Sequence, residues 1–231
     1  MSLYNRDYIN EQAQTATEHR LSDRTALSAF IRKTYQLFAA SLIAGAAGAY
    51  VGMGFVAYTV KAGLWIIVPF LAMLFILKAV CHKPVINYIM LFAFTFFSGF
   101  IISPYIVYYV SAGAGHLVTT AFILTAVAFG GLSLFAMTTK RDFSVMGKML
   151  FIILLVVFAA LVINYFWIQS SFMSLVISVV AVILFSAYIL YDTQNIIKGA
   201  YETPIEGAIA LYIHVFNLFV HLLNILGIMR D

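Results

Sequence analysis

Charged residues are scarce in this chain. Asp, Glu, Lys and Arg together account for 10% of its 231 residues, whereas soluble domains contain roughly 25%. Hydrophobic residues make up 64%, and the mean hydropathy is +1.01, so we expect an integral membrane protein surrounded by a lipid bilayer. Cysteine is almost lacking as well. The single Cys81 excludes an internal disulfide and a cysteine-rich metal site.

A secretory leader is also missing from residues 1–33. They are polar and of mixed charge, and no apolar run precedes a small-residue cleavage site. We therefore predict a polar cytoplasmic N-terminal tail, residues 1–33, that stays attached as a loosely ordered arm with a short interfacial helix near TALSAFIRKTYQLF. Charged tails of this kind are commonly only solvated, and binding of a partner is the alternative.

The chain instead contains a series of long apolar runs, each able to cross a hydrocarbon core of about 30 Å as a helix. The runs are continuous rather than alternating every second residue, which argues against strands. We predict an all-α membrane protein with a seven-helix transmembrane domain over residues 34–231. The runs lie near 34–57, 62–79, 85–110, 117–137, 146–166, 172–192 and 206–228.

Basic residues predict the orientation of these helices. The N-terminal tail and the second, fourth and sixth loops carry most of the Lys and Arg residues, whereas the opposite side has only Lys61 and Arg230. Because cytoplasmic loops are enriched in Lys and Arg, we place the N-terminus in the cytoplasm and the C-terminus outside. The same bias explains the net charge of +4, and no basic stripe or aromatic platform indicates binding of nucleic acid.

Enzymatic chemistry finds little support. An intramembrane aspartyl protease needs two carboxylates that share a proton, and the spans offer only Asp192. Ser133 in GGLSLF lacks a recognisable nucleophile turn, and neither an HExxH motif nor a phosphate-binding loop is present. We therefore expect no enzyme activity, no catalytic residue, no metal site and no cofactor.

Two features of the spans concern helix packing. In the third span, FFSGFIISPY places Pro104 inside apolar sequence, where the missing N–H should kink the helix. The kink either lines a cavity or is only a packing feature. In the first span, small residues at every fourth position allow close approach of helices in lipid, and we interpret them as internal packing rather than dimerisation. These ladders are Ser41, Gly45 and Ala49, and Ala44, Gly48 and Gly52.

An acid near the end of the sixth apolar run is the strongest functional signal, since intramembrane acids usually face the bundle interior. Asp192 precedes the sixth loop at Gly199, roughly 10 Å deep, and His214 follows Pro204 on the returning helix, roughly 15 Å deep. The two antiparallel helices therefore bring an acid and an imidazole to comparable depth. The alternative is that Asp192 caps toward the loop while His214 bonds a backbone carbonyl.

The last run carries polar residues on one helical face. His214, Asn217, His221 and Asn224 follow one another at steps of three, four and three. Four such side chains would not face lipid, so we predict that Asn217, His221 and Asn224 line an internal, hydrated path and that the other helices surround this one. One metal ion bound by both histidines is not expected, because they lie about 10.5 Å apart along the axis.

A family resemblance rests on four segments: AYILYDTQNII, ALYIHVFNLFVHLLNILG, FTFFSGFIISP and TTKRDFSVMGKML. Together they are similar to the Bax inhibitor-1 family of seven-helix membrane proteins, over nearly the whole chain after residue 30. The loop TTKRDFS and the ending ILGIMRD resemble the bacterial branch, whose members modulate a membrane-bound AAA protease. The resemblance implies an inner-membrane location, six helices around a central seventh, and a pH-sensitive acidic pair that controls a calcium leak.

This sequence departs from the implied acidic pair. Asp192 matches its first acid, but His214 occupies the position of the second, which removes a charge and an oxygen ligand for calcium. Two hypotheses follow: a pH-sensitive cation leak, of calcium or protons, gated by Asp192 and His214, and a non-conducting partner of the AAA protease. For the leak, imidazole's unperturbed pKa of about 6.5 predicts that acidification forms an ion pair and closes the path, and that rising pH loosens it.

Overall fold

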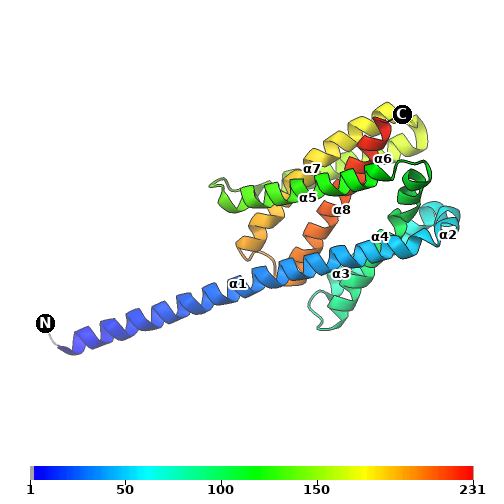
Figure 1. Cartoon of the computed structure of the whole chain (residues 1–231). Helices are drawn as coiled ribbons and strands as arrows, with labels where there is room; N and C mark the ends of the chain where they lie inside the picture. The colour runs from blue at the N-terminus through cyan, green and yellow to red at the C-terminus, as the bar shows by residue number, and fades with distance from the viewer. Residues whose placement is uncertain (1–2, 231) are drawn as a thin grey trace.

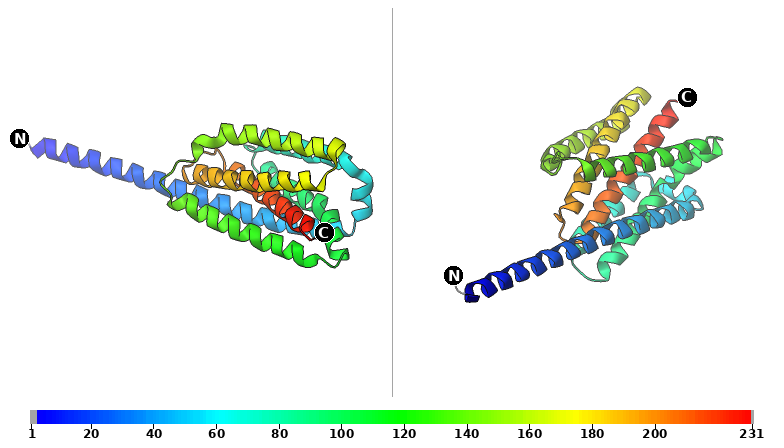
Figure 2. Two further views of the ribbon diagram at one scale, coloured as in Figure 1. Left: turned by 90° about the horizontal axis from the view of Figure 1, so that it is seen from above. Right: turned by 60° about the vertical axis from the view of Figure 1, so that its left-hand side comes forward.

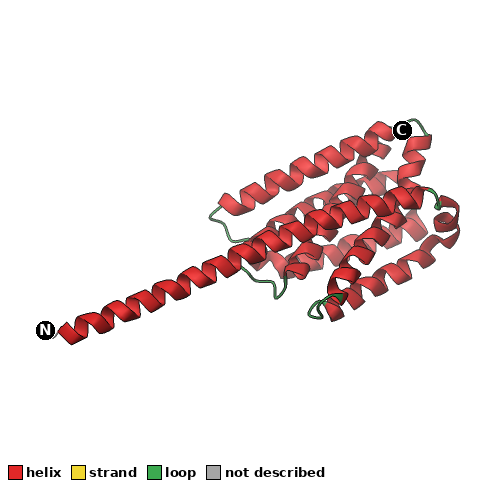
Figure 3. Cartoon of the chain, turned by 60° about the horizontal axis from the view of Figure 1, so that its bottom comes forward, coloured by secondary structure: helices red, strands yellow, loops and turns green. Residues whose placement is uncertain are grey.

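The computed structural model describes residues 3–230, with side chains from residue 22 onward except that of Leu64. All regular structure in these residues is helical (Figure 3), which confirms the all-α prediction. The α-helices, with the intervening 3-10 turns η1 and η2 and the π turn η3, are α1 (Leu3–Met53), α2 (Val56–Ala62), η1 (Gly63–Ile66), α3 (Ile67–Val80), α4 (Ile86–Ser111), α5 (Gly115–Thr138), η2 (Ser144–Met146), α6 (Gly147–Ile163), η3 (Asn164–Ile168), α7 (Ser171–Ile197) and α8 (Pro204–Ile228).

Six helices in the described residues are long and apolar enough to cross a membrane, or seven if the bent pair α2 and α3 is counted as one span. The two helices of that pair meet at 90°, next to Gly63 with its φ of +52°. Of the helix predicted over 62–79, residues 67–79 lie in α3, whereas residues 63–66 form η1 at the bend. With 14 residues, α3 rises about 21 Å, which is less than a hydrocarbon core of about 30 Å.

The N-terminal segment also differs from its prediction. Residues 3–33 form the first part of α1, one continuous helix that reaches Met53, instead of a loosely ordered arm with a short helix of its own. The physical reason is the absence of helix breakers, since neither proline nor glycine occurs before Gly45. The start of α1 projects well beyond the other helices (Figures 1 and 2).

The small residues of α1 pack against α4. A Cβ atom on Gly48 would collide with the backbone carbonyl of Phe96, and one on Gly99 of α4 would collide with the carbonyl of Gly45. Such contacts need glycine on both helices, as expected for close packing in lipid, and they confirm the interpretation as internal packing. Pro104 lies inside α4 and has no N–H to donate to the carbonyl of Phe100, one turn earlier. The Ser103 hydroxyl donates to that carbonyl instead, at 2.8 Å.

The last helix packs against four others. α8 packs against α1, α4, α5 and α7, and in Figure 1 it crosses between α5 and α7 on one side and α1 on the other. Its residues Leu211, Leu218 and Leu223 have 0% exposure. Polar side chains on α8 therefore face protein on several sides, which positions the candidate site.

Contacts between loops show which connections share an end of the bundle. Lys198 Nζ lies 2.6 Å from Asp142 Oδ1, which joins the end of α7 to the α5–α6 loop, and His82 Nε2 lies 2.7 Å from Glu202 Oε2, which joins the α3–α4 and α7–α8 loops. Near the other end, Arg230 donates to the carbonyl of Ala112 at 3.1 Å. The three basic loops thus gather at one end, and Arg230, just after α8, meets the α4–α5 connection.

Candidate functional site

The structure brings the sequence-predicted acid and imidazole into direct contact. His214 Nδ1 of α8 lies 2.5 Å from Asp192 Oδ2 of α7, and the exposed fractions of their side chains are 13% and 2%. One carboxylate oxygen of Asp192 therefore bonds the imidazole, and His214 does not merely bond a backbone carbonyl. At this degree of burial, the stability of the contact depends on the charge of both partners, because little water is available to solvate a charge that loses its partner.

A third residue, Tyr201 of the α7–α8 loop, completes the hydrogen bonding of the carboxylate. Its hydroxyl donates to Asp192 Oδ1 at 2.7 Å. Burial raises the pKa of Tyr201, and the negative charge of Asp192 raises it further, so the phenol keeps its proton and remains a donor. Both oxygens of Asp192 thus have a partner, one on α8 and one in the loop.

Aromatic rings hold the imidazole in place. The ring of Tyr188, one turn before Asp192 on α7, stacks on His214 with a centroid distance of 4.2 Å and an interplanar angle of 15°. The ring centroid of Phe185, also on α7, lies 5.9 Å from that of His214 and 5.9 Å from that of His221. The stacking fixes the orientation of His214, and Phe185 lies between the two histidines.

A second polar cluster lies deeper along the same two helices. His221 Nδ1 lies 3.2 Å from Ser178 Oγ, and Asn224 Nδ2 donates to Ser178 Oγ at 2.8 Å and to Ser174 Oγ at 3.1 Å. The hydroxyl of Tyr105 on α4 donates to Asn224 Oδ1 at 2.8 Å. His221 and Asn224 therefore bind α7 and α4, as expected of residues that face the bundle interior.

Asn217 behaves differently from its neighbours in the polar stripe. Its side-chain amide donates to the carbonyl of Ile213 at 2.8 Å, one turn back on its own helix. The four polar residues of α8 thus fall into three groups. His214 contacts Asp192, His221 and Asn224 form the second cluster, and Asn217 between them bonds its own helix.

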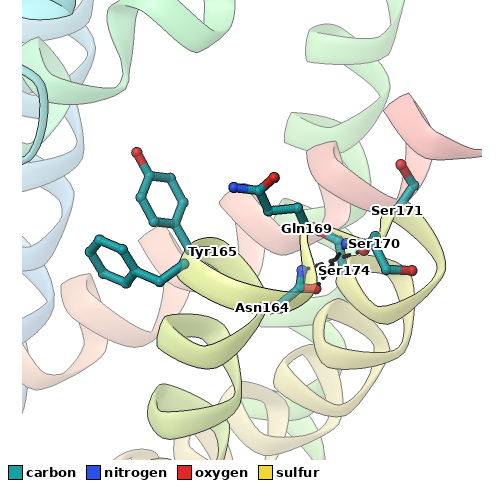
Figure 4. Close-up of a pocket in the computed structure, with 7 residues that line it drawn as sticks. Asn164, Tyr165, Gln169, Ser170, Ser171 and Ser174 are labelled. Carbon is teal, nitrogen blue, oxygen red and sulfur yellow. Dashed lines mark hydrogen bonds between the residues drawn. The ribbon is translucent and has the colours of Figure 1, made fainter.

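The deeper cluster leads to an open cavity at the α6–α7 turn. The cavity has a volume of about 520 Å³ and is lined by residues of η3 and the start of α7, including Ser174. In Figure 4 Asn164 and Ser170 lie together, joined by hydrogen bonds of 3.2 and 3.4 Å that hold this turn, and Gln169 points into the open space. Because Ser174 also accepts from Asn224, the cluster connects with the cavity.

A second cavity is apolar and borders α8. It has a volume of about 530 Å³ and lies between α1, α4, α5 and α8. Its lining is mostly hydrophobic, with a few hydroxyl-bearing residues. One of these is Tyr212, whose hydroxyl contacts Ser98 and donates to the carbonyl of Thr95 at 3.0 Å. Ile102 and Ile106, on either side of Pro104, also line it, so the proline segment borders a cavity.

Sequence reasoning missed several partners at the site. Ser174 and Ser178 share a face of α7 with Asp192, because they precede it by 18 and 14 residues, close to five and four helical turns. That spacing could have identified them. Tyr105 and Tyr201 reach the site from α4 and from a loop, and no periodicity within one segment could have revealed either contact.

Comparisons with known proteins agree with this architecture. The Campylobacter jejuni protein Cj0236c is 50% identical over 231 residues, covering 98% of this chain and 97% of its own. A Helicobacter pylori (strain J99) protein is 39% identical over 233 residues, covering 100% and 99%. The Escherichia coli K12 protein YccA, described as a modulator of FtsH protease, is 37% identical over 155 residues, covering 67% and 70%.

The family model described as "Inhibitor of apoptosis-promoting Bax1" matches residues 27–231. This match covers the chain from within α1 through α8, and it agrees with the resemblance of the α4, α7 and α8 motifs. The chain therefore belongs to the Bax inhibitor family of integral membrane proteins.

Proposed function

We propose that the chain is a pH-responsive proton leak in a bacterial inner membrane, gated where α7 and α8 meet at Asp192 and His214. The observation that carries the proposal is the buried contact of 2.5 Å between these two side chains. The titratable groups around Asp192 are His214, Tyr188, Tyr191 and Tyr201. Of these, the imidazole is the group whose ordinary pKa lies near neutrality.

The switch works through the charge of the imidazole. In acid, protonated His214 neutralises the Asp192 carboxylate, and the ion pair holds α7 and α8 together. When His214 loses its proton, a buried carboxylate remains without a countercharge, a loss that costs about 3–5 kcal/mol in buried pairs. The helices then separate or admit water, and the path opens as pH rises.

The polar clusters supply the rest of the path. The site at Asp192 and His214 lies toward the end of the bundle with the basic loops, and the cluster at His221 and Asn224 leads to the cavity at the α6–α7 turn. Phe185 lies between them and contacts both histidine rings. In the closed state this ring separates the two halves, and it moves aside when α7 and α8 loosen.

Protons fit this site better than calcium. Calcium takes six to eight oxygen ligands, whereas Asp192 is the one carboxylate of the contact and both its oxygens are engaged, by Tyr201 and His214. Imidazole is a poor ligand for calcium and a good carrier of protons.

The proposed topology has seven spans, with α2 and α3 as one broken span, α8 at the centre and residues 1–33 in the cytoplasm. The gathering of the basic loops at one end and the contact between Arg230 and Ala112 at the other support it. Single-cysteine labelling in intact cells tests it: residues 25 and 229 should react from opposite sides, and labelling from the same side would refute the topology.

Proton flux into liposomes that contain the purified chain tests the leak. We expect flux that rises between about pH 5 and pH 8, the range over which histidine changes charge, and little calcium flux. Empty liposomes give the background flux, and the Asp192→Asn variant, which lacks the acid of the gate, is the control for pH dependence. Absence of flux throughout this range would refute conduction.

A second function is favoured by the relative YccA, described as a modulator of FtsH protease. We propose that the chain binds a membrane-bound protease of that kind and alters its proteolysis, with the projecting start of α1 as the contact. Proteolysis of a membrane substrate by the co-reconstituted protease should change when the chain is added, and removal of residues 1–30 should abolish the change. Equal proteolysis with and without the full chain would refute this function.

A further inference from the structure

Four side chains that can ligate metal ions meet where the α3–α4 loop touches the start of α8. Cys81 and His82 follow α3, and Glu202 and Glu206 flank the first residue of α8. Cys81 Sγ lies 3.0 Å from His82 Nδ1 and 3.4 Å from Glu206 Oε1. The ligand atoms of Cys81, His82 and Glu206 all lie within 4.8 Å of one another, a grouping found once in the described part of the chain.

These distances suit a tetrahedral metal ion. Zinc binds thiolate at about 2.3 Å and imidazole nitrogen or carboxylate oxygen at about 2.0–2.2 Å, so neighbouring ligand atoms lie roughly 3.3–3.6 Å apart. Pairs that include sulfur lie at the upper end of this range, so the distances of 3.0 and 3.4 Å from Cys81 Sγ would have to lengthen by about 0.6 and 0.2 Å. Three protein ligands leave the fourth position for water, as in open zinc sites.

Surrounding hydrogen bonds already orient the ligands. His82 Nε2 lies 2.7 Å from Glu202 Oε2, and a carboxylate on this nitrogen leaves the Nδ1 lone pair directed at the ion, as in many histidine metal sites. Asn87 donates to the carbonyl of Cys81 at 2.9 Å, which fixes the backbone of the cysteine. Glu206 accepts the N–H of Glu202 on Oε2 at 3.0 Å, so its Oε1 remains directed at Cys81.

We propose that Cys81, His82 and Glu206 bind one thiophilic divalent cation, with Zn²⁺ the best match, and that Glu202 positions the imidazole. A thiolate ligand selects zinc, cobalt or iron over calcium and magnesium, which prefer oxygen. Binding replaces the thiol proton of Cys81, so one proton is released to solvent.

The cation would fasten the α3–α4 loop to the start of α8. Glu202 is adjacent to Tyr201, the donor to Asp192, so the metal would also immobilise the loop that completes the buried pair. Metal binding itself does not depend on conduction or on a protease partner, and its test is separate from theirs.

Cobalt titration of the purified full-length chain tests the site. Cobalt bound to a thiolate gives a sulfur-to-metal charge-transfer band in the near ultraviolet, and Cys81 is the one cysteine of the sequence. We expect this band to appear with one equivalent of Co²⁺, to vanish when Zn²⁺ displaces it, and to be missing in Cys81→Ser. Absence of the band in the wild-type chain would overturn the proposal.

Variants distinguish a built site from a reactive thiol alone. Glu202→Gln should weaken Co²⁺ binding about 10–100-fold, and His82→Ala and Glu206→Gln should weaken it at least as much. Gln at position 206 preserves the helix cap, and His116→Ala, at an exposed histidine near the other end of the bundle, is the matched control. Unchanged affinity in both His82→Ala and Glu206→Gln would leave only adventitious binding by Cys81 and would refute the site.

Discussion

Asp192 and His214 lie 2.5 Å apart across the contact of α7 and α8, although 22 residues separate them in the sequence. The carboxylate is almost fully buried and the imidazole is 13% exposed. A proton added to or removed from the imidazole therefore changes the charge balance of the helix contact itself.

Replacement of His214 by aspartate should change both the pH and the ion of the switch. In His214→Asp two carboxylates share the site, so the closed state forms by sharing one proton rather than by an ion pair. The second carboxylate also adds oxygen ligands for calcium. We expect a pH-dependent leak with a different midpoint, together with calcium flux, in the liposome assay. A variant with the wild-type midpoint and no calcium flux would contradict the assigned role of His214.

Phe185 should act as the barrier between the two polar clusters. Its ring contacts both His214 and His221, so Phe185→Ala should join the clusters through water and raise proton flux at acidic pH. The change can cost about 3–5 kcal/mol of stability, and Phe185→Leu, which keeps an apolar side chain, serves as the folded comparison. The matched control is Phe172→Ala, at a residue of α7 that is 73% exposed. Equal flux at acidic pH in folded Phe185→Ala and wild type would refute the barrier.

The glycine contact between α1 and α4 should tolerate no added methyl group. Gly48→Ala places its Cβ against the Phe96 carbonyl, and overpacking of this kind costs about 1–3 kcal/mol. Gly130→Ala on α5 is the matched control, because nothing lies within 4 Å of its added Cβ, and it should gain about 0.5–1 kcal/mol from the lower flexibility of alanine. Thermal unfolding in detergent should therefore shift in opposite directions for the two variants. A shift in the same direction would contradict the packing.

The ion pair between Lys198 and Asp142 should respond to pH outside the range of the switch. The hydrogen bond from Lys198, followed by those from the Ser144 hydroxyl and N–H, lowers the pKa of Asp142 to about 2. Because the folded pKa lies below the ordinary value of about 3.9, the contact stabilises the fold above about pH 4 and is lost as pH falls through about 2. Both side chains are about half exposed, so high salt should weaken the contact.

Hydrogen exchange of the α5–α6 loop measures this prediction. After correction for the intrinsic effect of pH, exchange of residues 139–146 should be constant between about pH 5 and pH 8 and should increase in Asp142→Asn. Protection that changes with pH over that interval would show that the loop takes part in the histidine switch, contrary to the account.

Part of the fold could be predicted from the sequence because apolar length and helix breakers are local. The runs 85–110, 117–137, 172–192 and 206–228 lie within α4, α5, α7 and α8, apart from a residue at one end. The break between α2 and α3 was missed, because it depends on one glycine, Gly63, with positive φ inside a continuous apolar segment.

The site could be predicted only as far as depth and helical face determine it. The contact of Asp192 with His214 could be predicted from their similar depth on two antiparallel helices. The polar face of the last helix led us to expect His221 and Asn224 toward the bundle interior. The amide of Asn217 donates to its own helix, because helical position does not decide which acceptor a side chain bonds, and its place along an internal path stays a prediction.

Contacts between distant loops lay beyond sequence reasoning. Cys81 and Glu206 are 125 residues apart, and only the packing of α3, α4 and α8 brings the loop at Cys81 to the start of α8. The expectation that the chain has no metal site rested on the single cysteine, the missing HExxH motif and the spacing of His214 and His221. It did not consider a mixed set of sulfur, nitrogen and oxygen ligands from distant loops, such as the one proposed above.

The distance between α7 and α8 as a function of pH tests the central claim most directly. Spin labels are placed at Phe172→Cys, at the start of α7, and at Met229→Cys, just after α8; both residues are exposed in the native chain. They measure the distance between the two helices at the end opposite the α7–α8 loop. The background is Cys81→Ser, which has no other cysteine. The account predicts a short distance at about pH 5 that lengthens toward about pH 8, and a distance independent of pH in Asp192→Asn. A constant wild-type distance, or a change that persists in Asp192→Asn, would contradict it.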